Sequence, residues 1–395
     1  MRAFRNEGSR GLALVGAVLV VWCLGCTNRV LGGLVERRDA GVGGSAGDGG
    51  DGGSLGAAGE GGSAGSAAGG AGGGTSGDPC VVSCGTAPCP VRAGQPRVLA
   101  TSPSNLQIAA IAVDADTLYW GTYPSVAAGE IRSMPLAGGP STLLAQNVVV
   151  TELYLDGSTL YYVTSDRLGG SSLVAIPAAG GTARVIATAP GIRTIASDAS
   201  SIYFGQGSSG AGAGPYQITR VDRAGSGVTP LVVLTGVLWG FAVDDANVYW
   251  AAYSSGGTLS RRALAGGNIV TLHGSSAPIN SPVVDGDDVV FVEGINTPDV
   301  CQSAVWAVSK AGGAAPRLVS PGTSGIDVWR PVRDATHLYW GRSGRQGSLL
   351  RTVKGQTPEI LAQDQRSVGP VILGPADVYW IAGADSAYEV RTLPK

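Results

Sequence analysis

Side chains that commonly carry out catalysis are scarce in this sequence. It has two histidines, His273 and His337, so a zinc site with three histidine ligands cannot be assembled. Residues 43–47 and 61–65 fit the G-x-S-x-G pattern of a hydrolase nucleophile, but their glycine- and serine-rich surroundings supply neither the strand nor the helix that this motif requires. We therefore expect no catalytic residues, no metal site and no cofactor, and we predict that the chain is not an enzyme.

A different set of residues has the chemistry of a binding site. Aromatic walls with a few polar groups are typical of ligand sites. The candidates are Glu152, Arg193, Trp239, Trp329 and Arg330. Each stands four or five residues before a phrase that recurs along the chain, and the residue types at these positions differ from copy to copy, unlike positions kept for packing alone. The alternative interpretation is that these positions are solvated and vary freely.

The recurring phrase begins at an aspartate and ends at two aromatic residues. Its first copy is the segment 114–120, with the sequence Asp-Ala-Asp-Thr-Leu-Tyr-Trp. The second aromatic residue of each copy stands at positions 120, 162, 204, 250, 291, 340 and 380. The period of 40 to 49 residues is that of a four-stranded propeller blade, so the sequence predicts an all-β, seven-bladed β-propeller with antiparallel blades. The aspartate is expected to cap a turn and the aromatic residues to pack between blades.

The turns divide each blade into strands. In the first blade the sequence predicts strands at 109–113, 118–123, 129–136 and 141–146, with glycines in the last turn. The seventh copy ends after a third strand at 388–393, and its missing piece lies upstream, where residues 93–100 match 354–362 in type and order. The strand 96–100 is therefore predicted to complete the last blade and to close the ring.

The repeats resemble those of secreted and lipid-anchored bacterial propellers with a D-x-x-x-[LV]-Y-W signature and, more distantly, the YWTD propellers. The Thr-Asp pair that would follow Tyr-Trp is absent from every copy, and the count is seven instead of six, so the partners of the YWTD family are not carried over. Propellers usually bind ligands on the face formed by the loops that join strands two to three and four to one. This resemblance implies that the five candidate residues surround one mouth of the central channel.

The N-terminus has the pattern of an export signal. Arg2, Arg5 and Arg10 precede an apolar run over 11–22, which is too short to span a bilayer. The run ends in the segment 23–26, Cys-Leu-Gly-Cys, which resembles the lipobox of bacterial lipoproteins and implies cleavage before Cys26 and lipidation of that cysteine. Thr27, which is not an acidic retention residue, implies by the same resemblance the outer membrane of a Gram-negative bacterium. An ordinary signal peptide or an uncleaved anchor is the alternative.

The segment between Cys26 and the repeats divides into a tether and a cysteine-containing lead-in. Residues 26–79 are rich in glycine, serine and alanine, cannot bury enough apolar surface to offset chain entropy, and are predicted to be disordered. The predicted domains are 1–25 signal peptide, 26–79 tether, 80–95 lead-in and 96–395 propeller. The cysteines beyond residue 79 are Cys80, Cys84, Cys89 and Cys301. An oxidising compartment favours disulfides over a metal site or free thiols, and of the three possible pairings we favour Cys84–Cys89 with Cys80–Cys301.

Charge and composition limit the class of partner. The net charge is −2 and only 14% of residues are charged, so the sequence has no basic stripe for nucleic acid. The sequence favours a monomeric, lipid-anchored envelope protein whose propeller is a binding or scaffold module for a protein, peptide or glycan. One alternative is a propeller enzyme of lyase or hydrolase type in which Glu152 acts at the channel mouth. Another is a scaffold for outer-membrane assembly.

Overall fold

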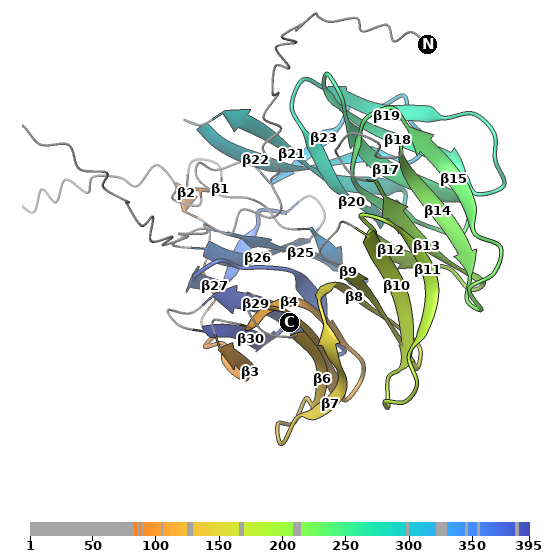
Figure 1. Cartoon of the computed structure of the whole chain (residues 1–395). Coiled ribbons are helices and arrows are strands. Elements are labelled where there is room, and N and C mark those ends of the chain that lie inside the picture. Colours follow the sequence, from red (N-terminus) through yellow and green to blue (C-terminus); the bar gives the residue numbers. More distant parts are fainter. Residues whose placement is uncertain are drawn as a thin grey trace, which may run out of the picture. The chain divides into compact units, whose positions relative to one another are not determined.

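The described part of the chain consists of β-strands and turns. A computed structural model describes residues 83–84, 87–88, 91–92, 94–103, 106–124, 129–165, 170–207, 215–297, 300–320, 330–343, 347–353, 356–383 and 387–395. All of them belong to the unit Gly74–Lys395. Within these ranges there is no helix of the length and apolar character that a membrane span needs. Figure 1 shows the strands grouped into successive twisted sheets that follow one another along the sequence.

Seven of the sheets are four-stranded antiparallel blades, in which each strand pairs with the next one along the chain except where β3 completes the last blade. Blade 1 contains β4 (Leu106–Val113), β5 (Thr117–Pro124), β6 (Gly129–Pro135) and β7 (Thr142–Val148). Blade 2 contains β8 (Val150–Asp156), β9 (Thr159–Ser165), β10 (Gly170–Pro177) and β11 (Arg184–Pro190). Blade 3 contains β12 (Arg193–Ser197), β13 (Ser201–Gln206), β14 (Tyr216–Asp222) and β15 (Thr229–Leu234). Blade 4 contains β16 (Val237–Val243), β17 (Asn247–Tyr253), β18 (Gly257–Ala263) and β19 (Val270–Ser275).

The remaining blades follow the same order. Blade 5 contains β20 (Ile279–Asp285), β21 (Asp288–Thr297), β22 (Val300–Ser309) and β23 (Arg317–Ser320). Blade 6 contains β24 (Val332–Arg333), β25 (His337–Arg342), β26 (Gly347–Val353) and β27 (Glu359–Gln365). Blade 7 contains β28 (Val371–Leu373), β29 (Asp377–Gly383), β30 (Ala387–Pro394) and β3 (Arg97–Pro103). A short hairpin of β1 (Ser83–Cys84) and β2 (Ala87–Pro88) precedes them.

Blade 7 confirms the predicted closure of the ring. Its fourth strand is β3, which comes from the N-terminal end of the propeller and pairs antiparallel with β30. The register places Arg97 opposite Thr392 and Ser102 opposite Tyr388. The strand is longer than the predicted 96–100 and continues to Pro103, because β30 itself extends to Ala387 and offers further pairing partners. The two ends of the folded chain therefore lie in one sheet.

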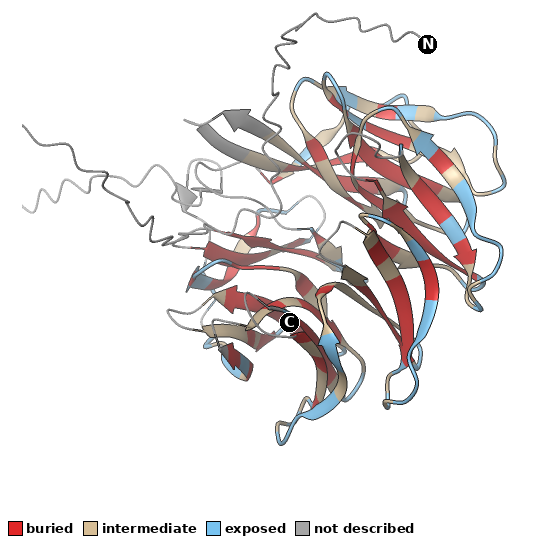
Figure 2. Ribbon diagram, viewed as in Figure 1, coloured by how far each residue is buried: buried red, intermediate tan, exposed pale blue. Residues whose placement is uncertain are grey.

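The hydrophobic core lies between neighbouring blades. Alternating side chains of each second strand point to opposite faces of its sheet, so the two aromatic residues of the phrase enter two different interfaces. In blade 7, for example, Trp380 packs with residues of blade 6 such as Tyr339, whereas Tyr379 packs with residues of blade 1 such as Trp120. Figure 2 shows the buried residues concentrated in the inner strands and the exposed ones in the outer strands and turns. The prediction that these aromatic residues pack between blades is therefore confirmed.

The recurring aspartate caps the turn between the first and second strands. In blade 1 the Asp114 Oδ1 atom accepts hydrogen bonds from the backbone N–H groups of Asp116 and Thr117, at 2.9 and 2.7 Å. Its Oδ2 atom accepts a hydrogen bond of 2.9 Å from the Tyr119 hydroxyl. The same arrangement occurs in blade 6, where the corresponding aspartate is Asp334. Burial disfavours the charged form of Asp334, but the hydrogen bonds that it accepts outweigh burial and lower its pKa to about 2.

The cysteine and N-terminal predictions fall largely outside the described residues. Cys26, Cys80 and Cys89 are not among them, nor are residues 1–79 with the predicted signal peptide and tether. The backbone of Cys84 lies in β1 and that of Cys301 in β22, but their side chains are not described. The disulfide pairing, the lipidation and the domain boundaries therefore stay predictions.

Candidate functional site

The innermost strands of five blades carry a β-bulge near the predicted channel mouth. In blade 2, Val150 pairs with Thr164 and Glu152 with Val163, so Thr151 is an extra residue. The corresponding irregularities lie at Ala109, Thr194, Trp239 and the pair Ser281 and Pro282. A bulge bends its strand and changes the direction of the neighbouring side chains. Glu152, Arg193 and Trp239 thus stand at or next to a bulge of their strand.

Arg330 joins blades that are far apart in the ring. It precedes the innermost strand of blade 6, and its Nη2 atom lies 3.7 Å from Oε1 of Glu152 in blade 2. The same nitrogen donates a hydrogen bond of 3.2 Å to Oγ1 of Thr194 in blade 3. In a ring of seven blades, blade 6 faces blades 2 and 3 across the axis. The Arg330 side chain therefore extends across the channel instead of lining one side of it.

Thr194, which accepts the hydrogen bond from Arg330, has a strained backbone conformation. Its φ of 55° lies in the left-handed region, which a β-branched residue rarely adopts. The residue is also buried, with only 6% of its surface exposed. Backbone strain of this kind is often found at functional sites, where the surrounding structure maintains it. The residue with the strained backbone, Thr194, is thus also the residue that accepts the hydrogen bond from Arg330.

Arg193 lies beside this cluster but makes its own contacts. Its guanidinium donates hydrogen bonds to the backbone oxygens of Gly207 and Gly191, at 3.1 and 3.4 Å. It also lies over the Tyr216 ring, 5.9 Å from the centroid. Burial lowers the pKa of Arg193, while the neighbouring Tyr216 and Glu152 counteract this effect by favouring the charged form. Arg193 thus contributes positive charge near Glu152 and is held in position by blade 3.

The Trp239 candidate packs in the core between two blades, away from this cluster. Trp239 is half-buried against the core between blades 4 and 5, with its ring centroid 6.4 Å from that of Tyr253. Its indole Nε1 atom is buried and has no hydrogen-bond partner among the described residues. The bulge at Trp239 explains this position, because the extra residue changes the alternation that the sequence pattern assumes. Trp329 lies outside the described residues.

A second polar cluster joins blades 4 and 5 and was not predicted from the sequence. Nε2 of His273 lies 2.9 Å from Oε2 of Glu293, and the Ser275 hydroxyl donates to Oε1 of the same carboxylate at 2.5 Å. Because the serine contacts the glutamate and not the histidine, this is not the arrangement that activates a serine nucleophile. The cluster ties β19 to β21. No sequence motif links these residues, which come together only when the two blades pack.

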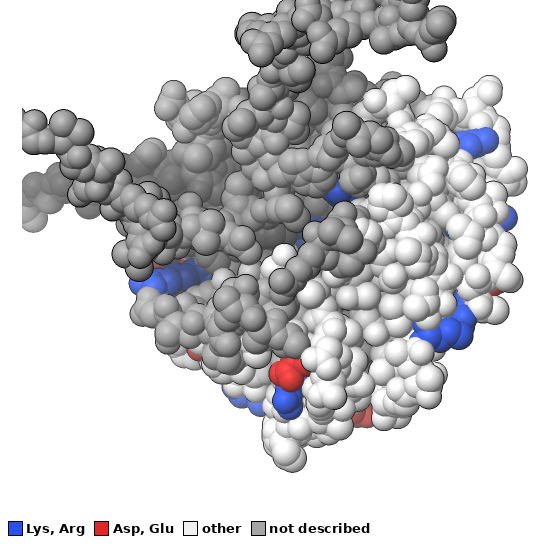
Figure 3. Space-filling model, in the orientation of Figure 1, with Lys and Arg blue, Asp and Glu red and all other residues white. Residues whose placement is uncertain are grey.

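On the face drawn in Figure 3 most of the described atoms are uncharged, and the lysines, arginines and acids form small separate groups. Among the described residues there is no group of three or more histidine, cysteine, aspartate or glutamate side chains that could hold a metal ion. We call Glu152, Thr194, Arg193 and Arg330 the channel cluster. Arg330 contacts Glu152 and Thr194, and Arg193 adds positive charge near Glu152.

The blade order, the closing strand and the channel cluster define the chain as a seven-bladed β-propeller with polar groups across its axis. No protein-family model matches the sequence, and no curated protein is similar enough to it to be a relative. The lipoprotein assignment and the YWTD-like character of the repeats thus stay predictions.

Solved structures with similar folds include propellers of peptidases. A prolyl endopeptidase is 10% identical with a TM-score of 0.54, and the match covers 73% of this chain and 50% of that one. A puromycin-hydrolyzing peptidase of Mycobacterium tuberculosis is 13% identical with a TM-score of 0.57, covering 76% of this chain and 54% of that one. This chain spans about half the length of these two peptidases.

A third similar structure is a propeller alone. The β-propeller domain of the Trilobed protease from Pyrococcus furiosus is 9% identical with a TM-score of 0.55, and the match covers 74% of this chain and 94% of that one. That domain is described as having an open velcro topology, whereas β3 closes the ring in this chain. At these identities the likeness shows the fold alone.

The prediction that the chain is not an enzyme is wrong. It was based on the lack of a catalytic motif in the sequence, whereas the folds similar to this one occur in a prolyl endopeptidase, a puromycin-hydrolyzing peptidase and the tricorn protease. The physical reason is that a propeller brings together residues from several blades, as the contact of Arg330 with Glu152 and Thr194 illustrates. A linear motif is therefore a poor guide to activity in this fold.

Proposed function

We propose that the chain is an exported, lipid-anchored propeller that binds the C-terminal carboxylate of a peptide at its channel mouth. The observation that carries this proposal is the position of Arg330, whose guanidinium reaches from blade 6 to Glu152 and Thr194. Arginine presents N–H donors in a fixed fork that matches the two oxygens of a carboxylate. A group of this kind on the axis of a ring is within reach of a chain end that enters the channel.

The existing contacts of Arg330 leave room for a ligand. Its side chain remains 44% exposed, and its distance of 3.7 Å to Glu152 is long for a charged hydrogen bond. An ion pair with this exposure contributes roughly 0–1 kcal/mol to stability. Exchange of Glu152 for a ligand carboxylate would therefore cost the fold little. Arg193 adds a second positive charge nearby, so the cluster of two arginines and one glutamate favours an anionic partner.

The similar structures support a peptide over a glycan as the ligand. Peptidases act on peptides, and two of the similar propellers belong to such proteins. The C-terminal carboxylate of a peptide is also a group that an arginine fork can bind through two hydrogen bonds. Hydrolysis of the bound peptide is a second candidate function, because Glu152 places a carboxylate that could act as a general base within the same cluster.

Peptide binding can be tested with the purified full chain and a synthetic library of hexapeptides with free C-termini. For the tightest binder, measured by fluorescence anisotropy, Arg330→Ala is expected to weaken binding at least tenfold, which corresponds to about 1.4 kcal/mol. Glu152→Gln is expected to maintain or strengthen binding, because it removes a competing carboxylate. Arg132→Ala is the matched control, since Arg132 also pairs with a glutamate, at 2.5 Å, but lies in β6.

The result that would contradict the proposal is binding that amidation of the peptide C-terminus leaves unchanged, or that Arg330→Ala and Arg132→Ala weaken equally. Mass spectrometry of the peptide after incubation separates binding from catalysis. Cleavage by the wild-type chain that is lost in Glu152→Gln would establish the second candidate, and an intact peptide would exclude it for that sequence.

The proposed membrane localisation of the protein depends on lipidation of Cys26. If the lipobox resemblance holds, the wild-type chain is expected to incorporate a labelled fatty acid in a Gram-negative host and to fractionate with membranes. Cys26→Ser is expected to lose the label and the membrane fraction. Cys23→Ser, three residues upstream in the same segment, is the control and should retain both. Labelling of the Cys26→Ser variant would contradict lipidation at this residue.

A further inference from the structure

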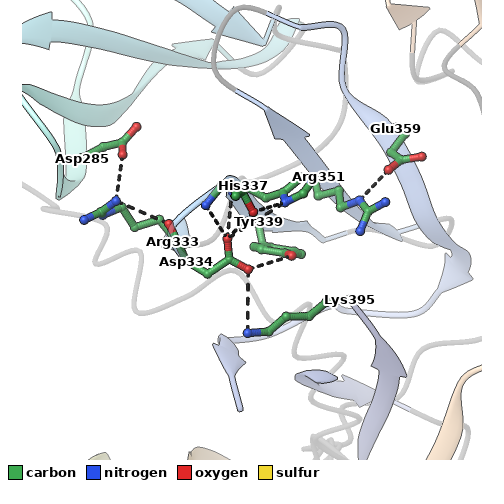
Figure 4. A network of polar contacts seen from close by, with 9 residues as sticks. Asp285, Arg333, Asp334, His337, Tyr339, Arg351, Glu359 and Lys395 are labelled. Atoms are coloured by element: carbon green, nitrogen blue, oxygen red, sulfur yellow. Dashed lines mark hydrogen bonds and ion pairs between the residues drawn. The ribbon is translucent and has the colours of Figure 1, made fainter. Parts of the chain in front are cut away.

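Ion pairs between blades recur at the end of the strands opposite the channel cluster. At three interfaces a cation that follows the third strand of one blade reaches the repeat aspartate of the preceding blade. The pairs are Arg223–Asp156 at 2.6 Å, Lys310–Asp244 at 2.9 Å and Lys395–Asp334 at 3.7 Å. Figure 4 shows the last of these, with Asp334 also accepting the Tyr339 hydroxyl.

Blade 2 has an alanine at the position of these cations. The backbone N–H of Ala178 donates to the Ser158 oxygen at 2.8 Å, as that of Lys310 donates to Asp287 at 2.8 Å and that of Lys395 to Ala376 at 3.0 Å. The three residues are therefore structurally equivalent. Asp114 of blade 1 makes the usual bonds to its own turn and to Tyr119, but no cationic side chain among the described residues pairs with it.

An open groove lies where the cation would otherwise be. It has a volume of about 520 Å³ and lies between blades 1 and 2. Its lining includes Asp114, Tyr119, Ser133, Thr142, Ser158 and Ala178. The carboxylate supplies negative charge, and the hydroxyls supply further hydrogen-bond acceptors. An ammonium group has three N–H donors and no acceptor, so it matches this set of groups.

Two other interfaces lack a cation at this position, and both differ from the interface between blades 1 and 2. Between blades 7 and 1, Leu136 takes the position and the aspartate is replaced by Gly374, so the acid and the cation are absent together. Between blades 3 and 4, Leu264 takes the position and packs against the core there. Asp114 thus faces a blade that has only the methyl group of Ala178 at the position of the cation.

We propose that the groove between blades 1 and 2 binds the primary ammonium group of a lysine side chain from another polypeptide. Asp114 would take the role toward this lysine that Asp244 takes toward Lys310 within the chain. The proposal is independent of the peptide site at the channel mouth, because the groove lies at the other end of the strands. A lysine placed here would complete a contact that the repeat makes internally at other interfaces.

The probe for this site is hexalysine, with its Nε-acetylated form as the uncharged control. Isothermal calorimetry with the full chain is expected to show binding of hexalysine and not of the acetylated peptide. Asp114→Asn is expected to weaken binding at least tenfold, whereas Asp334→Asn, at an interface already occupied by Lys395, should leave it unchanged. A thermal melt of each variant shows whether it is folded.

A second variant tests the groove with Asp114 intact. Ala178→Lys introduces the cation found at the equivalent position of blades 5 and 7, and it is expected to abolish hexalysine binding while maintaining or raising the Tm. Leu136→Lys is the matched control, because it adds the same charge next to Gly374 and should leave binding unchanged. Equal binding by the wild type, Asp114→Asn and Ala178→Lys would overturn the proposal, as would the absence of hexalysine binding by the wild type at millimolar concentration.

Discussion

Replacement of Trp380 by alanine is expected to lower the free energy of unfolding by about 3–5 kcal/mol, the range measured for buried tryptophan and phenylalanine. The Trp380 side chain is fully buried and lies in the core between blades 6 and 7. Its loss leaves a cavity lined by residues such as Tyr339 and Leu361, which belong to rigid strands and cannot collapse to fill the space. Unfolding in guanidinium chloride followed by far-ultraviolet circular dichroism measures the change.

The control for this prediction is Val233→Ala in β15. The Val233 residue is 58% exposed, so its truncation should change stability by no more than about 0.5 kcal/mol. The loss of stability for Trp380→Phe should lie between those of Val233→Ala and Trp380→Ala, since phenylalanine maintains most of the apolar contact. A loss of less than about 1 kcal/mol for Trp380→Ala would show that the blade 6 and blade 7 interface is not packed as described.

Deletion of β3 (Arg97–Pro103) is expected to abolish the cooperative unfolding transition. Without this strand, β30 becomes an edge with unpaired backbone groups, and the buried side chain of Val390 loses its neighbour Ala100. Exposed edges of this kind promote association, so the deleted chain is expected to be recovered mainly as aggregate. Thermal melts and size-exclusion chromatography measure both effects. Deletion of residues 41–73 is the control and should leave the Tm unchanged.

The pairing can also be tested without removing the strand. Thr101 lies opposite Glu389 in the register of β3 and β30. Cysteines at these two positions are expected to form a disulfide on mild oxidation, whereas cysteines at Thr101 and Arg391 are two residues out of register and should not. Peptide mapping by mass spectrometry identifies the linked pair. Efficient linkage of the second pair would mean that the ring closes in a different register.

The sequence predicted the blades well because their physical causes are local. Each aspartate bonds the backbone of its own turn, and each pair of aromatic residues belongs to one strand, as Asp114 and Tyr119 illustrate. The closing strand was also predictable, because residues 93–100 have the same type and order as 354–362 and the last copy of the repeat lacked a partner. The observed strands differ from the predicted ones only at their ends, because the length of a strand depends on the partners available for pairing.

The channel cluster was predicted only in part. The sequence assigned Glu152 and Arg330 to one mouth of the channel, and the structure brings their side chains within 3.7 Å of each other. The direction of Trp239, in contrast, depends on a bulge that no local pattern indicates. The cluster of His273, Ser275 and Glu293 depends on the packing of two blades and has no signal in sequence. In contrast, the pairing of Asp244 with Lys310 could have been found by comparing each aspartate with the turn of the following blade.

The seam between β3 and β30 also has a consequence for the time course of folding. In the other blades a turn of a few residues joins the third strand to the fourth, whereas in blade 7 the two partners are separated by nearly the whole propeller. The strand β3 is synthesised first but can pair only after β30, the last strand, has been made. Closure of so long a loop carries a large entropic cost. A nascent or exported chain would therefore contain six complete blades before β3 could pair with β30. The lifetime of the closed ring would then depend on the rate at which β3 separates from β30.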